Sequence, residues 1–273
     1  GFEHIWQLGP AWRDGEVTDR HLPEFTILEW YRAWEGVEAI MEDVEHLTRL
    51  VLGGTAKVRN RNTTEENLDI DLGEPFLRRT MQQLYNEACG FDILEALTYE
   101  SLLHACRAHA LLDLDRSTGA PHGMQRWDAL FFELHITYVE PLIASLGTVF
   151  VTEWPTPLAV LARRDERDPR VAKRFELYVG GVELANGFEE LTDPIEQRTR
   201  FEEDLTCRAA LEQPPLPMPE SFLATLERGL PPSAGVAMGF DRMVMLALGA
   251  ATIQEVAPLS TRRDPVRGGI TWV

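Results

Sequence analysis

The chain has 273 residues, of which 44% are hydrophobic and 26% are charged, values typical of a folded protein rather than a disordered chain. Asp and Glu outnumber Lys and Arg by 44 to 26, and the formal net charge of -18 disfavours nucleic acid as a partner and favours cationic ligands. No apolar run approaches the roughly 18 residues that cross a bilayer, so we expect no membrane partner. The three cysteines lack metal-ligand spacing and indicate a reducing compartment, so we expect a cytoplasmic protein.

The N-terminal quarter predicts a hairpin followed by a helix. Residues 5–8 and 25–31 are apolar, aromatic and β-branched, and the polar stretch between them predicts an antiparallel hairpin with a long loop. Apolar residues then recur at helical spacing over 37–51, and two glycines end that helix. Residues 55–72 are polar and are expected to form a surface loop.

The rest of the sequence mixes helices with short strands. Helical spacing recurs at about 76–88, 98–113 and 125–146, and again in the charged segment 194–211. Strands are expected at 149–152, 175–179 and 182–185, the last two joined by a Gly180–Gly181 turn. Residues 235–240 predict a strand that runs into an apolar helix closed by Gly249. Hairpins and helices without βαβ alternation predict an α+β fold, with an antiparallel sheet flanked by helices.

The loop of the first hairpin is the first candidate site. It presents Arg13, Glu16, Arg20 and His21, followed by Phe25. Arginine and histidine on a loop suit a polyphosphate, and the aromatic ring offers a stacking face for a base. The alternative is an exposed charged hairpin with the phenylalanine in the core.

A second candidate lies in the later hairpin. Glu176 and Glu183 fall on adjacent strands, and paired carboxylates beside a phosphate site bind magnesium through oxygen. Asn186 and Glu190 follow and could bind the carboxylate and amine of an amino acid. The alternatives are solvated strand glutamates and a plain Asn-Gly turn.

The third candidate is the Gly235-x-x-x-Gly239-x-Asp241-Arg242 segment. Its glycines permit close approach of a ligand, and Arg242 at a helix start could stack over a base. This spacing alone is a weak signal, and it matches neither a Walker loop nor a dinucleotide fingerprint.

Taken in order, these segments resemble a class II aminoacyl-tRNA synthetase catalytic domain of the lysyl subgroup. Arg13 to Phe25 is similar to that class's motif 2, and residues 235–242 to motif 3. The resemblance runs from about residue 5 to about residue 261. We therefore expect a class II synthetase-like catalytic domain over 1–261 and a C-terminal tail without an assigned role over 262–273.

Three details make the chain more similar to a shorter paralogous family, the elongation factor P–lysine ligases. These are the sequence around Trp30, the sequence of residues 183–188, and Ala237 within motif 3, where lysyl-tRNA synthetases usually carry glycine. An added methyl at the floor of the amino-acid pocket fits that family's preference for (R)-β-lysine.

The resemblance implies an ATP-dependent, AMP-forming ligase. Lysine or (R)-β-lysine would attack the α-phosphate of ATP, and the acyl group would move from the adenylate to a lysine of elongation factor P. Such a ligase uses ATP with Mg²⁺, and the charge of -18 disfavours tRNA as acceptor. The roles implied are catalysis by Arg13 and Arg242, ATP binding by Arg13, Glu16, His21, Phe25 and Arg242, amino-acid binding by Glu29, Tyr31, Asn186, Glu190 and Ala237, and metal binding by Glu176 and Glu183.

The sequence departs from the family pattern in two places. The glutamate expected two positions after Arg13 is replaced by Gly15, and Glu16 follows it. Motif 1, which builds the dimer interface of the class, should lie before residue 1, so a homodimer is left open. Two other interpretations also stay open, namely a lysyl-tRNA synthetase fragment or ligase for another carrier, and a non-catalytic synthetase-like interaction protein.

Overall fold

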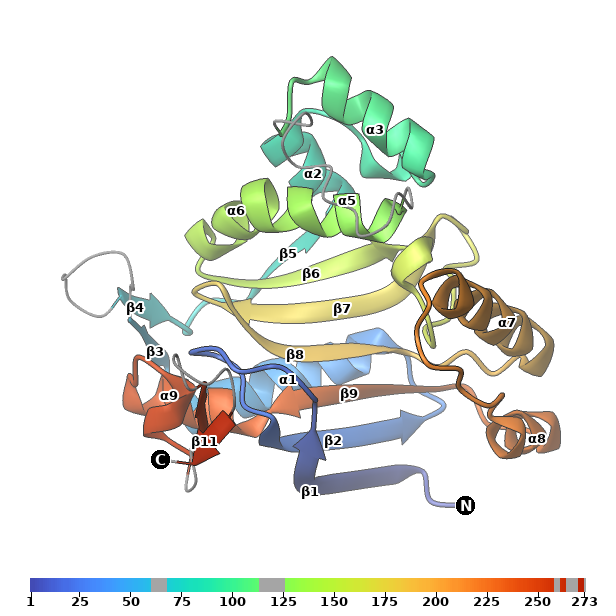
Figure 1. The fold of residues 1–273 in the computed structure, drawn as a ribbon. Coiled ribbons are helices and arrows are strands. Elements are labelled where there is room, and N and C mark those ends of the chain that lie inside the picture. The colour runs from blue at the N-terminus through green and yellow to red at the C-terminus, as the bar shows by residue number, and fades with distance from the viewer. Residues whose placement is uncertain (60–67, 113–125, 258–260, 264–269, 273) are drawn as a thin grey trace.

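The computed structural model describes residues 1–59, 68–112, 126–257, 261–263 and 270–272. Its centre is a seven-stranded sheet, shown in Figure 1, in which all neighbours are antiparallel except the parallel pair β5–β6. In spatial order the strands are β1 (His4–Trp12), β2 (Glu24–Ala33), β9 (Ser233–Gly239), β8 (Val182–Glu189), β7 (Val171–Val179), β6 (Thr148–Pro155) and β5 (Leu77–Thr80). The predicted α+β class is confirmed, with one parallel edge added.

Most helices lie close to the expected segments, but residues 77–80 of the segment expected to be helical at about 76–88 form strand β5, and the helix over Glu220–Arg228 was not expected. The helices are α1 (Val37–Leu52), α2 (Met81–Cys89), α3 (Tyr99–Ala108), α5 (Trp127–Leu134), α6 (Glu140–Ser145), α7 (Pro194–Ala210), α8 (Glu220–Arg228) and α9 (Phe240–Leu248). A π-helical turn over His135–Val139 joins α5 to α6, and short 3₁₀ turns cover Ile93–Glu95, Thr156–Leu158 and Ile253–Glu255. None of the helices in the described part of the chain is long and apolar enough to cross a membrane.

One face of the sheet packs on α1 and α9. Because side chains alternate along a strand, Leu28, Met238 and Ala185 lie side by side in the pairing of β2, β9 and β8 and point to this face. They join Ile40 of α1 and Met243 of α9 in one buried core. Burying each large apolar side chain contributes about 1.5–3 kcal/mol, so this core holds the central strands in register.

The opposite face is covered over only part of its width. Figure 1 shows α2, α3, α5 and α6 grouped beside β5 and β6. Tyr85 and Phe131 of this helical group pack with Val149, Val151 and Tyr178 of β6 and β7 in a second buried core. The neighbouring part of the same face, over β8, β9 and β2, therefore stays open for a ligand.

The predicted surface loop at 55–72 was wrong in part. Strand β3 (Thr55–Val58) pairs with β4 (Leu68–Asp71), and residues 60–67 lie outside the described residues. Ala56, Val58 and Ile70 are buried, which is the alternation of a half-buried hairpin. The tail adds a second small pair, β10 (Thr261–Arg263) with β11 (Ile270–Trp272).

Candidate active site

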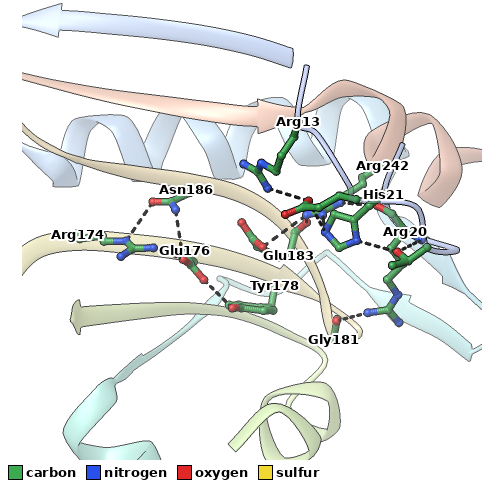
Figure 2. Close-up of polar contacts among 12 residues, drawn as sticks. Arg13, Arg20, His21, Arg174, Glu176, Tyr178, Gly181, Glu183, Asn186 and Arg242 are labelled. Carbon is green, nitrogen blue, oxygen red and sulfur yellow. Dashed lines mark hydrogen bonds and ion pairs between the residues drawn. The ribbon is translucent and has the colours of Figure 1, made fainter. Parts of the chain in front are cut away.

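A cavity of about 250 Å³ opens on the uncovered part of the sheet face. The hairpin loop between β1 and β2, strand β8, and the β9–α9 junction surround it, so all three candidate segments of the sequence meet there. Figure 2 shows the polar side chains at this place. The predicted site residues that line the cavity are Arg13, Glu16, His21, Phe25, Glu183, Asn186, Ala237 and Arg242.

Backbone and side-chain contacts fix the hairpin loop. The N–H of Arg13 donates to the carbonyl of Pro23 at 2.9 Å and closes the loop at its base. At the far end, Arg20 Nη1 donates to the carbonyl of Gly181 at 2.7 Å. Gly180 and Gly181 have φ angles of 54° and 76°, the left-handed region that a two-residue hairpin turn requires. The β7–β8 turn therefore anchors the loop across the cavity.

Arg242 joins the loop to the strands. Its Nη2 donates to Nε2 of His21 at 2.7 Å, and its Nη1 donates to the carbonyl of Glu183 at 2.6 Å. Since arginine has no acceptor atom, Nε2 of His21 accepts, and the protonated Nδ1 donates to Thr18 Oγ1 at 2.8 Å. Burial, followed by the charge of Arg242, lowers the pKa of His21, so the ring is neutral near pH 7.

Arg13 and Glu16 form the outer rim of the cavity. Arg13 Nη1 lies 3.2 Å from Glu16 Oε2, and the Arg13 guanidinium sits 5.9 Å from the centre of the Phe25 ring. Gly15, at φ 78°, makes the turn that brings the glutamate back to the arginine. The one-residue displacement of this glutamate in the sequence thus still places it beside Arg13.

Glu176 and Glu183 share the open face but differ in surroundings. Glu176 is buried, and its carboxylate accepts from Arg174 at 2.6 Å, from Tyr178 at 2.6 Å and from Asn186 at 3.2 Å. Burial, together with the charge of Glu183, raises the pKa of Glu176 to about 7. The Glu183 carboxylate is more exposed and lies 3.5 Å from Arg242.

This donor set suits Mg²⁺. A magnesium ion typically takes one or two protein carboxylates and completes its shell with phosphate oxygens and water. The repulsion between Glu176 and Glu183 is what a divalent cation relieves. Within the described residues, no group of three or more His, Cys, Asp or Glu side chains is placed to hold a metal by itself.

The predicted amino-acid residues follow one another along the same face. Strand pairing sets Glu29 opposite Ala237, and Ala237 opposite Asn186. Tyr31 lies against Gly235, where an added Cβ would come within 2.4 Å of the ring. Four predicted site residues lie outside the lining of the cavity itself, namely Glu29, Tyr31, Glu176 and Glu190.

Glu190, one of the residues predicted to bind the amino acid, has a carboxylate oxygen that lacks a hydrogen-bond partner. This oxygen, Oε1, is buried, and burial raises the pKa of Glu190 to about 7. Burial, then the charges of Glu190 and Glu29, raises the pKa of Tyr31. A buried carboxylate without a partner is costly, and a ligand ammonium group would compensate it.

The family model described as tRNA synthetases class II (D, K and N) matches residues 1–263. The chain belongs to this family. Among similar proteins, the elongation factor P–(R)-β-lysine ligase of Proteus mirabilis is 39% identical over 252 residues, which are 92% of this chain and 70% of that protein. The corresponding ligase of Edwardsiella ictaluri is 38% identical over 261 residues, 95% of this chain and 72% of that protein.

Lysine–tRNA ligases are similar over a comparable part of the chain. That of Anaeromyxobacter sp. (strain K) is 35% identical over 276 residues, 97% of this chain and 52% of that protein. The chain thus spans about half the length of the lysine–tRNA ligases that it matches. The resemblance to class II synthetases of the lysyl subgroup and to their elongation factor P paralogues is confirmed.

Sequence reasoning missed part of this class II site. Arg174 and Tyr178 lie two residues before and after Glu176 and donate hydrogen bonds to its carboxylate. The ring centre of Trp154 lies 4.4 Å from Cζ of Arg174. The sequence spacing could have indicated Arg174 and Tyr178, because residues two apart on a strand share a face with Glu176. The contact from Trp154 comes from another strand, and no local spacing indicates it.

Proposed function

We propose that this class II synthetase domain activates lysine or (R)-β-lysine with ATP and transfers it to a lysine of elongation factor P. The observation that carries the proposal is the orphaned Oε1 of Glu190. Glu190 directly follows β8, and its even spacing from Asn186 assigns it to the sheet face on which Asn186 lines the cavity with Arg13, His21 and Arg242. A basic cluster suited to a polyphosphate beside an unpaired carboxylate suits a reaction between ATP and a cationic amino acid. Two relatives named elongation factor P–(R)-β-lysine ligase support the acceptor.

In the first step, a carboxylate oxygen of the amino acid attacks the α-phosphorus of ATP. The P–O bond to pyrophosphate breaks, and the products are an aminoacyl-adenylate and pyrophosphate. Arg13 would hold the α-phosphate and the substrate carboxylate, Phe25 would stack on adenine, and Glu16 would lie near the adenine amine. His21 and Arg242 would bind the outer phosphates, with Arg242 also packing on adenine. Positioning and charge stabilisation supply the catalysis.

Glu176 and Glu183 are the residues that would hold Mg²⁺. When bound, the ion offsets repulsion among the phosphate oxygens. At the other end, Glu29, Tyr31, Asn186 and Glu190 would bind the amino acid, and Ala237 would form the floor. Two carboxylates suit an ammonium group because a buried cation requires paired charge.

In the second step, a neutral amine of the acceptor attacks the carbonyl carbon of the adenylate. An amide bond forms, AMP leaves, and the amine loses a proton. We also propose that residues 1–261 form the catalytic domain, that the protein acts in the cytoplasm, and that it assembles as a homodimer.

An exchange assay between ATP and labelled pyrophosphate tests the first step. It uses lysine, (R)-β-lysine and (S)-β-lysine, and exchange with at least one of the first two is expected. Absence of exchange with all three would overturn the proposal and favour a non-catalytic interaction protein. Labelled amino acid is then offered to elongation factor P and to lysine tRNA, and label on the protein is expected.

A lysine–tRNA ligase fragment is the second candidate, and the 35% identity over 97% of this chain favours it. Charging of tRNA together with failure to label elongation factor P would establish it. The net charge of -18 argues for the protein acceptor, because a strongly acidic surface repels the phosphates of tRNA.

A further inference from the structure

Arg174 is a cation that contacts Glu176 and Asn186, and the proposed reaction assigns it no role. Each nitrogen of its guanidinium donates a hydrogen bond. Nη2 donates to Glu176 Oε1 at 2.6 Å, Nε donates to Asn186 Oδ1 at 3.3 Å, and Nη1 donates to the carbonyl of Leu158 at 2.9 Å. Figure 2 shows Arg174 and Asn186 converging on Glu176. One planar group thus contacts a proposed metal ligand and a proposed amino-acid ligand together.

The indole of Trp154 fixes the guanidinium from below. The Arg174 Cζ lies 4.4 Å from the ring centre, a cation–π contact. Trp154 itself is 2% exposed, and its Nε1 donates to the carbonyl of Val151 at 3.1 Å. Stacking and three hydrogen bonds together leave Arg174 one orientation.

This geometry also sets the Asn186 amide. Oδ1 accepts from Arg174, so Nδ2 is turned to Glu176, to which it donates at 3.2 Å. An arginine fork can serve both partners in one plane, whereas a lysine ammonium cannot reproduce the fork and the stacking at once.

We infer that Arg174, braced by Trp154, is a positioning residue that fixes Glu176 for the nucleotide–metal end and Asn186 for the amino-acid end at the same time. The inference rests on the proposed function and adds the group that links its two substrates. Arg174 touches neither substrate in this assignment and acts through the two side chains.

The test compares Arg174→Lys with Arg200→Lys. Arg200 is a matched control, since its side chain is only 10% exposed and it donates to the carbonyls of Val160 and Ala162 and to Glu196, yet it contacts no proposed site residue. Thermal unfolding checks that both variants fold. Trp154→Phe keeps a stacking ring, and Trp154→Leu removes it.

Two readouts are used, with Mn²⁺ as the probe ion. In ATP–pyrophosphate exchange, Arg174→Lys should lower kcat at least tenfold and raise the KM of the amino acid. Trp154→Leu should lower kcat by a smaller factor, and Trp154→Phe should leave kcat unchanged. In an electron paramagnetic resonance titration with ATP present, Arg174→Lys should weaken Mn²⁺ binding about fivefold or more. Arg200→Lys should stay within about twofold of wild type in both.

Equal behaviour of the two lysine variants in both readouts would overturn the inference. If the wild type shows no exchange with any of the amino acids, the proposed function fails, and the Mn²⁺ titration alone then decides the inference. Wild-type protein that binds no Mn²⁺ with ATP would overturn it as well.

Discussion

Nη2 of Arg242 lies 2.7 Å from Nε2 of His21, although 221 positions separate the two residues in the chain. The contact joins the first residues of α9 to the loop of the N-terminal hairpin. A second bond, from Arg242 Nε to the carbonyl of Arg20 at 3.3 Å, holds the same loop. The side chain proposed to bind ATP therefore also shapes the wall of the cavity.

Arg242→Ala should abolish adenylate formation while the fold survives. The variant removes the proposed phosphate and adenine contact, and we expect exchange to fall by about 10³ or more. It also removes hydrogen bonds to two backbone carbonyls, which should lower the free energy of unfolding by about 1–3 kcal/mol. Exchange and urea unfolding measure the two effects.

Arg198→Ala, which breaks an exposed ion pair with Glu220, is the control and should change neither exchange nor stability by much. Exchange preserved in Arg242→Ala would refute the assigned role.

Glu190 should make stability depend on pH when no amino acid is bound. Burial raises the pKa of this carboxyl to about 7, so the folded protein holds the proton more tightly than the unfolded chain. Stability is therefore lost as pH rises from the unfolded pKa, about 4.3, through 7. Glu190→Gln removes this contribution, so its free energy of unfolding relative to wild type should be more favourable at pH 8 than at pH 5.

The same variant should bind the amino acid poorly. Loss of the carboxylate proposed to bind the ammonium group should raise the KM for lysine or (R)-β-lysine about tenfold or more. Unfolding at the two pH values and exchange kinetics measure both effects. Glu202→Gln, at an exposed position of α7, controls for the loss of one negative charge. A stability difference that is the same at pH 5 and pH 8 would contradict the assignment.

The Gly180–Gly181 turn should be intolerant of a side chain. At Gly181 the φ angle is 76°, and an added Cβ would lie 2.7 Å from the Cβ of Ala144. Gly181→Ala should cost about 2 kcal/mol or more, from backbone strain and the clash with α6. Gly53→Ala is the matched control, because φ is 69° there but the space is open, so only the smaller conformational cost of about 1 kcal/mol applies. Equal urea midpoints for the two variants would show that the contact is not tight.

The sequence was informative where a local pattern carries the structure. β-Branched and aromatic residues predicted β2, the double glycine predicted the turn between β7 and β8, and the order of the three motifs predicted that Arg13, Glu183 and Arg242 meet. The hairpin in segment 55–72 was not predicted because its strands are four residues each, and in the described part of the segment the buried residues are two separated pairs, Ala56 with Val58 and Ile70 with Leu72. The contacts of Arg174 depend on strand pairing and on Trp154 from another strand, so no single segment carries that information.

Ala237→Gly should shift the choice of amino acid. Ala237 lies between Glu29 and Asn186 in the strand pairing, so its methyl group projects from the floor of the proposed amino-acid pocket. Since one methyl in a pocket is worth about 1–3 kcal/mol, we expect the ratio of kcat/KM for (R)-β-lysine over lysine to fall about tenfold. Ala234→Gly, on the same strand but on the opposite, buried face, is the control for the backbone freedom that glycine adds, and it should lower stability without altering the ratio. An unchanged ratio in Ala237→Gly would remove the methyl group as the determinant and leave selectivity to Glu29, Tyr31 and Glu190.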